Sequence, residues 1–292
     1  MRRVASILLP LDGSPESSKG VGCAVWLAEL LGATLHVLHA TAQPLPGKQA
    51  LDRLHVPAAR RSQIVVHQLA GAADSAVLAA VAALEVDLVI MSARGESASA
   101  GHDLSQRLGS IAQAVIERSP VPVLLLPLRY REALPWTSML AAASGEAVSD
   151  QALAAVVQLA AKLGLRVTVV HSEDGPESAG AAPLGSYADT VHHEFAGRLE
   201  QMVERGLAGS TREECKCINQ VRLRRGDVAE VLLEQAAQLG SSVLALGWHG
   251  ALGSGRAPVL KRLLEEAECP LLLVRGAEGS SARLKVGKEI DD

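Results

Sequence analysis

Short continuous apolar runs alternate along this chain with longer segments in which apolar residues recur every three or four positions. In the first half the runs cover residues 5–11, 34–40, 63–70, 87–92 and 120–127. Such runs, each followed by turn residues, predict buried β-strands, and the segments between them predict helices, among them 74–85 and 110–119. A helix ending at Leu31 closes at Gly32, because glycine readily adopts the left-handed C-terminal cap.

The order of these elements indicates the fold class. Five apolar strands separated by helices predict an α/β domain with a doubly wound parallel sheet and helices on both faces.

The second half of the chain repeats this pattern. A constant shift of 132 residues places ILLPLDGS on MLAAASGE, Gly32 on Gly164 and His39 on His171. The shift becomes 155 at the third and fourth strands, where DLVIMSARG meets SVLALGWHG, and 148 at the last strand, where Pro122 meets Pro270. An internal repeat of this length predicts two tandem domains, which we place at residues 1–130 and 131–292.

The last strand of each half predicts how the domains meet. PVPVLLLP and CPLLLVR are apolar and come at the end of the chain order, where an edge strand is expected. An open apolar edge invites aggregation, and pairing the two edges closes both. We therefore expect a pseudo-twofold contact between the halves through these strands.

Composition narrows the class of protein. The 292 residues are 48% hydrophobic but include only three Trp, two Tyr and one Phe, which suits helices packed on a buried sheet. A net charge of -4 gives no general attraction for nucleic acid. No apolar run approaches the roughly 20 residues of a membrane span, and the N-terminus does not read as a signal peptide. We expect a cytoplasmic protein with neither a nucleic-acid nor a membrane partner.

The four cysteines predict free thiols rather than a disulfide framework. Cys215 and Cys217 follow His192 and His193 by about twenty residues, so zinc is an alternative. However, structural zinc usually uses C-x-x-C spacing, whereas C-x-C in a strand only places both thiols on one face. We predict no metal site.

The segments LLPLDGS, VIMSARG and GSIAQAVIERSPVPVLLLP, with VLALGWHG and CPLLLV in the second half, resemble the universal stress protein family in its tandem form. The resemblance covers nearly the whole chain. It implies two Rossmann-like, five-stranded parallel sheets related by a pseudo-twofold axis. Many family members bind ATP without being established as efficient catalysts, and others have lost the nucleotide site.

Nucleotide-binding members carry G-x-x-G, nine residues, and then Gly followed by Ser or Thr. Glycines let the backbone approach phosphates and adopt positive φ, and the N-terminus of the following helix favours an anion. In the first half Ser92 replaces the first glycine, Gly95 is the second, and Gly109 and Ser110 keep the helix-start pair. Thirteen residues, not nine, separate Gly95 from Gly109.

Asp12 matches the family aspartate that contacts the adenosine part of ATP, although an Asp in this position also commonly caps a helix. Parallel sheets bind ligands at the carboxyl ends of their strands, so Asp12 and the Ser92 loop should share one crevice. Within the loop, His102, Ser105 and Arg107 are within reach of a phosphate, or the loop is simply solvated. The complete predicted site is Pro10, Asp12, Gly13, Val37 (through its backbone), Ser92, Gly95, Gly109, Ser110 and Ile111.

The second half departs from the pattern at other points. Gly247 and Gly250 restore both loop glycines, but Ser144 replaces the aspartate. Ala257 and Pro258 stand at the Gly-Ser position, and only six residues separate Gly250 from Ala257. Proline removes an N–H donor and a shorter loop encloses less phosphate, so this half should not bind ATP in the family manner. Lys261 and Arg262 are expected on a solvated helix face.

Catalytic motifs are lacking. The chain has no G-x-S-x-G elbow, H-E-x-x-H helix or Walker motif. Asp103 and Glu96 are the only acidic residues inside the long loop, which gives an ATPase little support.

We therefore predict a non-enzymatic stress sensor or regulator whose first domain binds ATP (or ADP or AMP, with or without Mg²⁺). Its second domain would be a structural or regulatory partner with a degenerate site and an extended or disordered tail. The expected partners are the nucleotide and an unidentified protein; the halves form an intramolecular pseudo-dimer, and a homodimer stays open. The alternatives are an interaction module that binds no nucleotide and a slow ATPase.

Overall fold

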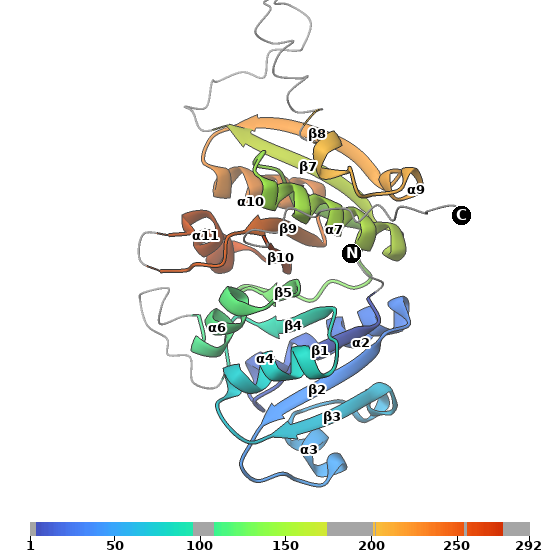
Figure 1. Ribbon diagram of the computed structural model, residues 1–292, viewed down its shortest axis with the longest axis vertical. Helices are drawn as coiled ribbons and strands as arrows, with labels where there is room; N and C mark the ends of the chain where they lie inside the picture. The colour runs from blue at the N-terminus through green and yellow to red at the C-terminus, as the bar shows by residue number, and fades with distance from the viewer. Residues whose placement is uncertain (1–3, 96–107, 174–200, 202, 254–255, 277–292) are drawn as a thin grey trace, which may run out of the picture.

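The computed structural model describes residues 4–95, 108–173, 201, 203–253 and 256–276. It contains one ten-stranded sheet with the strand order β3-β2-β1-β4-β5-β10-β9-β6-β7-β8. The first half of the chain lies at one end of the sheet and the second half at the other, with β5 beside β10 in the centre (Figure 1).

Each half contributes five parallel strands and the helices between them. The first half comprises β1 (Ser6–Pro10), α1 (Pro15–Ser18), α2 (Gly20–Leu31), β2 (Thr34–Ala40), α3 (Gly47–Arg53), the 3₁₀ helix η1 (Ala58–Gln63), β3 (Ile64–Leu69), α4 (Ala73–Ala83), β4 (Leu88–Ser92), α6 (Ser110–Arg118) and β5 (Val123–Leu126). The second half comprises β6 (Ser138–Ala142), α7 (Ala147–Leu163), β7 (Arg166–Glu173), α9 (Arg212–Cys215), β8 (Ile218–Arg225), α10 (Val228–Leu239), β9 (Val243–Trp248), α11 (Pro258–Glu266) and β10 (Leu271–Arg275). The predicted α/β class with two five-stranded parallel sheets is confirmed.

The halves join through their last strands. β5 and β10 pair antiparallel, with Leu271 opposite Leu125 and Leu273 opposite Val123. The side chains on these strands are buried, except that of Arg275 at the end of β10. This pairing confirms the expected contact between the two apolar edges, and it merges two sheets into one.

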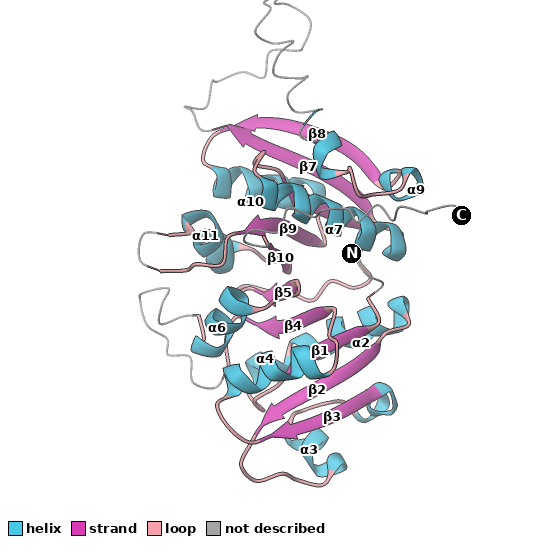
Figure 2. Cartoon of the chain, in the orientation of Figure 1, coloured by secondary structure: helices cyan, strands magenta, loops and turns pink. Residues whose placement is uncertain are grey.

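Helices cover both faces of the sheet, and each face has its own core (Figure 2). One core packs α2 and α7 against the sheet, and the other packs α4, α6, α10 and α11. Both cores contain residues of both halves, so the apolar layers run through the junction. Trp26 and Trp136 pack edge to face beside the first core, with ring centroids 5.0 Å apart.

Equivalent hydrogen bonds confirm the register of the repeat. Gly32 and Gly164 both cap their helices in the left-handed region, at φ 61° and 66°. At the ends of β2 and β7, His39 Nδ1 lies 2.9 Å from the Leu11 carbonyl oxygen, and His171 Nδ1 lies 2.7 Å from that of Ala143. The shift of 132 residues therefore relates both partners of this bond.

The two neighbouring cysteines lie before a strand rather than in one. Cys215 and Cys217 do not share a strand, because Cys215 ends α9 and β8 begins only at Ile218. The acidic capping box of Thr211 and Glu214 starts a helical turn there and takes this segment out of the strand. Our expectations for His102, Asp103, Glu96, Ser105 and Arg107, for His192 and His193 and for the tail beyond residue 276 fall outside the described residues. No helix in the described part of the chain is long and apolar enough to span a membrane.

Candidate functional site

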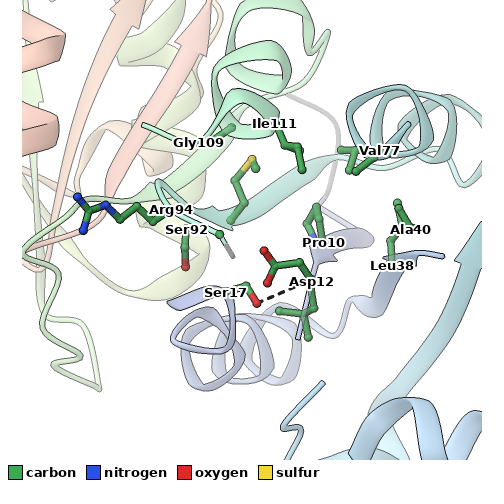
Figure 3. A pocket seen from close by; sticks show the side chains of 15 residues that line it. Pro10, Asp12, Ser17, Leu38, Ala40, Val77, Ser92, Arg94, Gly109 and Ile111 are labelled. Carbon is green, nitrogen blue, oxygen red and sulfur yellow. Dashed lines mark hydrogen bonds between the residues drawn. The ribbon is translucent and has the colours of Figure 1, made fainter. Parts of the chain in front are cut away.

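A crevice opens at the carboxyl ends of β1, β2 and β4, with the N-terminus of α6 on its rim. Its cavity volume is about 90 Å³. Figure 3 shows Asp12, Ser17 and Ser92 on one side of it and Leu38, Ala40, Val77 and Ile111 on the other, while Arg94 extends away from Asp12. The crevice therefore has a polar side and an apolar side.

The turn after β1 holds Asp12 in place. Asp12 Oδ1 accepts hydrogen bonds from the Ser14 N–H (2.9 Å) and the Ser14 hydroxyl (2.6 Å). Ser14 Oγ in turn accepts from the Ser17 N–H at 3.1 Å and is the N-cap of α1. The alternative role for Asp12 as a helix cap is therefore wrong, because Ser14 performs it. The carboxylate instead orders the turn beside the crevice.

Two residues of the β4 loop touch this turn. Ser92 Oγ donates to the Glu16 carbonyl oxygen at 2.7 Å, which ties the end of β4 to α1. A β-carbon at Gly95 would lie 2.3 Å from Asp12 Oδ2, closer than any side chain allows. Gly95 does not adopt positive φ, so it is needed here for close approach rather than for its backbone conformation.

Helix α6 supplies backbone donors. Gly109 caps it at φ −61°, outside the left-handed region, and its N–H donates to the Ala93 carbonyl oxygen at 2.9 Å. The N–H groups of the first helical turn have no partner within the helix, and they carry the positive end of its dipole. Gly109, Ile111 and Ala112 of this turn line the crevice, whereas the Ser110 side chain is exposed.

The apolar side follows from strand alternation. Leu38 lines the crevice, while its neighbour Val37 is fully buried in the core on the opposite face of the sheet. Successive strand residues point to opposite faces, so Val37 can reach a ligand only through its backbone. Val77 of α4, Met91 of β4 and Ile111 of α6 complete an apolar wall.

The structure brings six of the nine predicted site residues to the crevice. These are Pro10, Asp12, Ser92, Gly95, Gly109 and Ile111; the others, Gly13, Val37 and Ser110, do not line it. Sequence reasoning missed Ser17, Leu38, Val77, Met91 and Arg94. The repeat pointed to Ser17, because the shift of 132 residues places Ser17 on Ser149. The alternation of side chains along β2 pointed to Leu38.

The second half has an equivalent crevice built on the same hydrogen bonds. The Ser144 N–H donates to Ser149 Oγ at 2.9 Å, as the Asp12 N–H does to Ser17 Oγ at 3.4 Å. Ser144 Oγ accepts from the Glu146 N–H at 3.3 Å, the role that Asp12 Oδ1 has for Ser14. Ser144 therefore preserves the turn and removes its charge.

The second crevice is the larger of the two. Its cavity volume is about 770 Å³, against about 90 Å³ in the first half, although its loop is shorter. α11 begins at Pro258 with Ala257 as its N-cap, in agreement with the predicted alignment. Ala257 is left-handed (φ 52°), a strained conformation for alanine that sets the path of the loop into the helix.

The cysteines show no metal constellation. Burial, followed by the neighbouring Cys215, raises the pKa of Cys217 to about 11, so its thiol is protonated near neutral pH and is a poor ligand. The Cys217 Sγ lies 3.7 Å from the Val157 carbonyl oxygen, to which it donates. Within the described ranges no three His, Cys, Asp or Glu side chains are grouped to hold a metal ion.

The polar turn, the loop and the helix N-terminus at the carboxyl ends of a doubly wound parallel sheet define a class of α/β proteins with a ligand crevice at that edge. The universal stress protein family model matches residues 4–63, 48–127 and 135–275. The chain therefore belongs to the universal stress protein family. No curated protein matches the sequence.

Two solved structures share the fold over nearly the whole chain, and a third matches about half of it. A chain from Pseudomonas aeruginosa UCBPP-PA14 assigned to the universal stress proteins is 16% identical, with 93% of each chain covered and a TM-score of 0.62. A universal stress protein from Archaeoglobus fulgidus DSM 4304 is 17% identical, covers 95% of this chain and 98% of its own, and has a TM-score of 0.60. A universal stress protein solved in complex with cAMP is 15% identical and covers 48% of this chain and 96% of its own, with a TM-score of 0.35.

Proposed function

We propose that the first domain binds an adenine nucleotide, with ATP as the leading ligand, and that the protein acts as a stress-response sensor or regulator rather than a catalyst. The observation that carries the proposal is the convergence of Asp12, the Ser92–Gly95 loop and the first turn of α6 in one crevice. Asp12 offers a carboxylate to ribose hydroxyls, and the α6 N-terminus offers N–H donors to phosphate. The apolar wall of Leu38 and Val77 suits a base.

The volume of the crevice sets a condition on this function. A cavity of about 90 Å³ lies below the roughly 300–1,000 Å³ typical of ligand pockets, so ATP requires the crevice to widen. Binding of this kind changes the conformation of the protein, which is what a nucleotide-dependent sensor needs. The proposal therefore includes movement of the β4 loop and the start of α6 away from Asp12.

The proposal also assigns the two domains, the location of the protein and the place where a partner can bind. Residues 1–130 are the nucleotide domain, and 131–292 are a second domain whose Ser144 and Pro258 do not suit ATP. The protein acts in the cytoplasm on a protein partner or a second copy of itself. The edge strands β3 and β8 end the sheet, and each exposes a valine, Val65 and Val221, where a partner can pair.

Titration calorimetry with ATP, ADP and AMP up to millimolar concentration tests the function. We expect one equivalent of ATP to bind. Asp12→Ser, which gives the first half the residue found in the second, should weaken binding about tenfold or more, because it removes a charged hydrogen-bond acceptor. Ser144→Ala, at the equivalent position of the other half, is the matched control and should not change the affinity.

Two outcomes would favour the other hypotheses. No binding of any adenine nucleotide would leave the interaction module. ATP turnover that is lost in Asp12→Ser would identify a slow ATPase, whereas turnover that survives this change would point to a contaminant. Hydrogen exchange at residues 92–95 and 109–112 should change when ATP is added; unchanged exchange despite binding would place the nucleotide elsewhere.

A further inference from the structure

The crevice of the second half has the dimensions of a small-molecule site. Its volume of about 770 Å³ lies within the range of roughly 300–1,000 Å³ typical of ligand pockets. It lies at the carboxyl ends of β6, β7 and β9, beside the start of α11. Buried side chains from four elements form its apolar floor: Val170, Leu232, Leu246 and Leu260.

Arg275 gives this crevice a charged side chain at a position that is neutral in the first half. It ends β10, and the shift of 148 residues places it on Pro127 of the first half. A β-carbon at Gly250 would lie 2.6 Å from Arg275 Nε, so the side chain lies directly over the glycine backbone. The side chain is half-buried. In the described part of the chain its guanidinium has neither a hydrogen-bond acceptor nor a carboxylate partner, which leaves its donors for water or a ligand.

The other charged groups favour an anion. Arg256 lies at the rim of the crevice and is exposed. Among the described residues the one lining carboxylate is Glu146, which is 62% exposed and 2.8 Å from His249 Nε2. The position of the Asp12 carboxylate is occupied by the neutral Ser144. Two guanidinium groups, those of Arg256 and Arg275, thus line the crevice. The one carboxylate among the described lining residues, Glu146, already has His249 as its partner.

We propose that this crevice binds an organic carboxylate with an apolar body. A guanidinium matches a carboxylate through two parallel hydrogen bonds, so Arg275 holds the acid group, and the apolar floor holds the remainder. A triphosphate needs more donors than this. α11 starts with Pro258, which has no N–H, and no Gly-Ser pair precedes it. The site is separate from the ATP site of the first half and does not depend on it.

Octanoate is a suitable probe, with octan-1-ol as a neutral ligand of the same length. In titration calorimetry on the full chain, we expect one equivalent of octanoate to bind at least about tenfold more tightly than octan-1-ol, the difference being the charged hydrogen bonds. Arg275→Gln should reduce octanoate affinity to that of octan-1-ol. Arg131→Gln removes the same charge from a side chain that is 78% exposed and should have no effect.

A second variant keeps the proposal testable if Arg275→Gln does not fold. Ser144→Asp brings a carboxylate into the crevice on a turn that already accommodates Asp in the first half, so it should fold and weaken octanoate binding about tenfold. Equal binding of octanoate and octan-1-ol, or unchanged octanoate binding in Ser144→Asp, would overturn the proposal. So would competitive displacement of octanoate by ATP, which would make the crevice a nucleotide site.

Discussion

The two halves of this protein share a set of equivalent hydrogen bonds but differ in the volume and charge of their crevices. The turn bonds of Asp12 and Ser17 recur at Ser144 and Ser149, and those of His39 recur at His171. Yet one crevice is narrow and has the Asp12 carboxylate in its turn, whereas the other is wide, has the neutral Ser144 there and is lined by Arg275. Short-range hydrogen bonds that many residue types can make thus maintain the shared backbone geometry. The volume and charge of each crevice depend on a few substitutions.

The largest effect on stability should come from replacing a residue of the second half by the equivalent residue of the first half. Ser92 and Gly247 are equivalent, but a β-carbon at Gly247 would lie 2.5 Å from the Val148 carbonyl oxygen, because α7 approaches β9 closely there. Gly247→Ser should therefore lower the free energy of unfolding by about 3 kcal/mol. Ser92→Gly, which loses only the bond to Glu16, should cost about 1 kcal/mol. Chemical denaturation of both variants checks this order, and the reverse order would contradict our alignment of the crevices.

The next effect concerns the junction between the halves. Trp248 replaces Ala93 of the repeat, and its buried indole N–H donates to the Ile116 carbonyl oxygen of the other half at 2.9 Å. Trp248→Phe leaves that carbonyl without its donor and should lower the stability by about 1–3 kcal/mol. Trp26→Phe removes no hydrogen bond to a described residue and is the control in thermal unfolding. Equal losses in the two variants would show that ring volume, not the bond, matters.

A smaller effect is expected at the helix starts. Ala257 is left-handed, a conformation that alanine disfavours, whereas Gly109, which tolerates it, is not. Ala257→Gly should raise the free energy of unfolding by about 0.5 kcal/mol through relief of strain. Gly109→Ala should raise it by about 0.4–1 kcal/mol, because the unfolded chain loses freedom and the added β-carbon has room. Lower stability of both variants in urea unfolding would mean that the loop paths are set by other contacts.

The smallest expected effect is a pH dependence of stability that arises in the first half. His36 Nδ1 lies 2.9 Å from His67 Nε2, and burial, with the charge of His67 as a second cause, lowers the pKa of His36 from 6.5. The unfolded chain then binds a proton more readily than the native one, so stability should fall as the pH drops below about 6.5. The repeat places Thr168 and Arg222 at these positions. His36→Thr should flatten the pH dependence of the melting temperature between pH 7.5 and 5.5; an unchanged slope would assign it to other groups.

Much of the fold could be predicted because its signals are local. β2 occupies the predicted residues 34–40, α6 begins at the predicted Ser110, and α11 begins where the repeat placed Pro258. Apolar runs, caps and helix starts depend on neighbours in the chain. The short helix that ends at Cys215 also starts at a local signal, the capping box of Thr211 and Glu214.

The candidate site was predictable only in part. The residues that adjoin turn motifs, such as Asp12, Ser92 and Gly109, reach the crevice as expected, and those contributed by strand faces and by α4 were missed. The side of a strand that a residue occupies follows from alternation, but which helix packs over it does not. Val77, on α4, is an example: nothing in its neighbourhood distinguishes it from other core residues.

The sequence by itself determined the α/β class, the tandem repeat and the pairing of the two apolar edges, because each depends on patterns of burial that recur along the chain. Only the tertiary structure decided which crevice is wide and which holds a guanidinium that has no partner among the described residues. The close approach of α7 to β9 at Gly247, the left-handed Ala257 and the placement of Arg275 over Gly250 arise from contacts between distant segments. Volume and charge at a site are properties of that packing, and no local pattern encodes them.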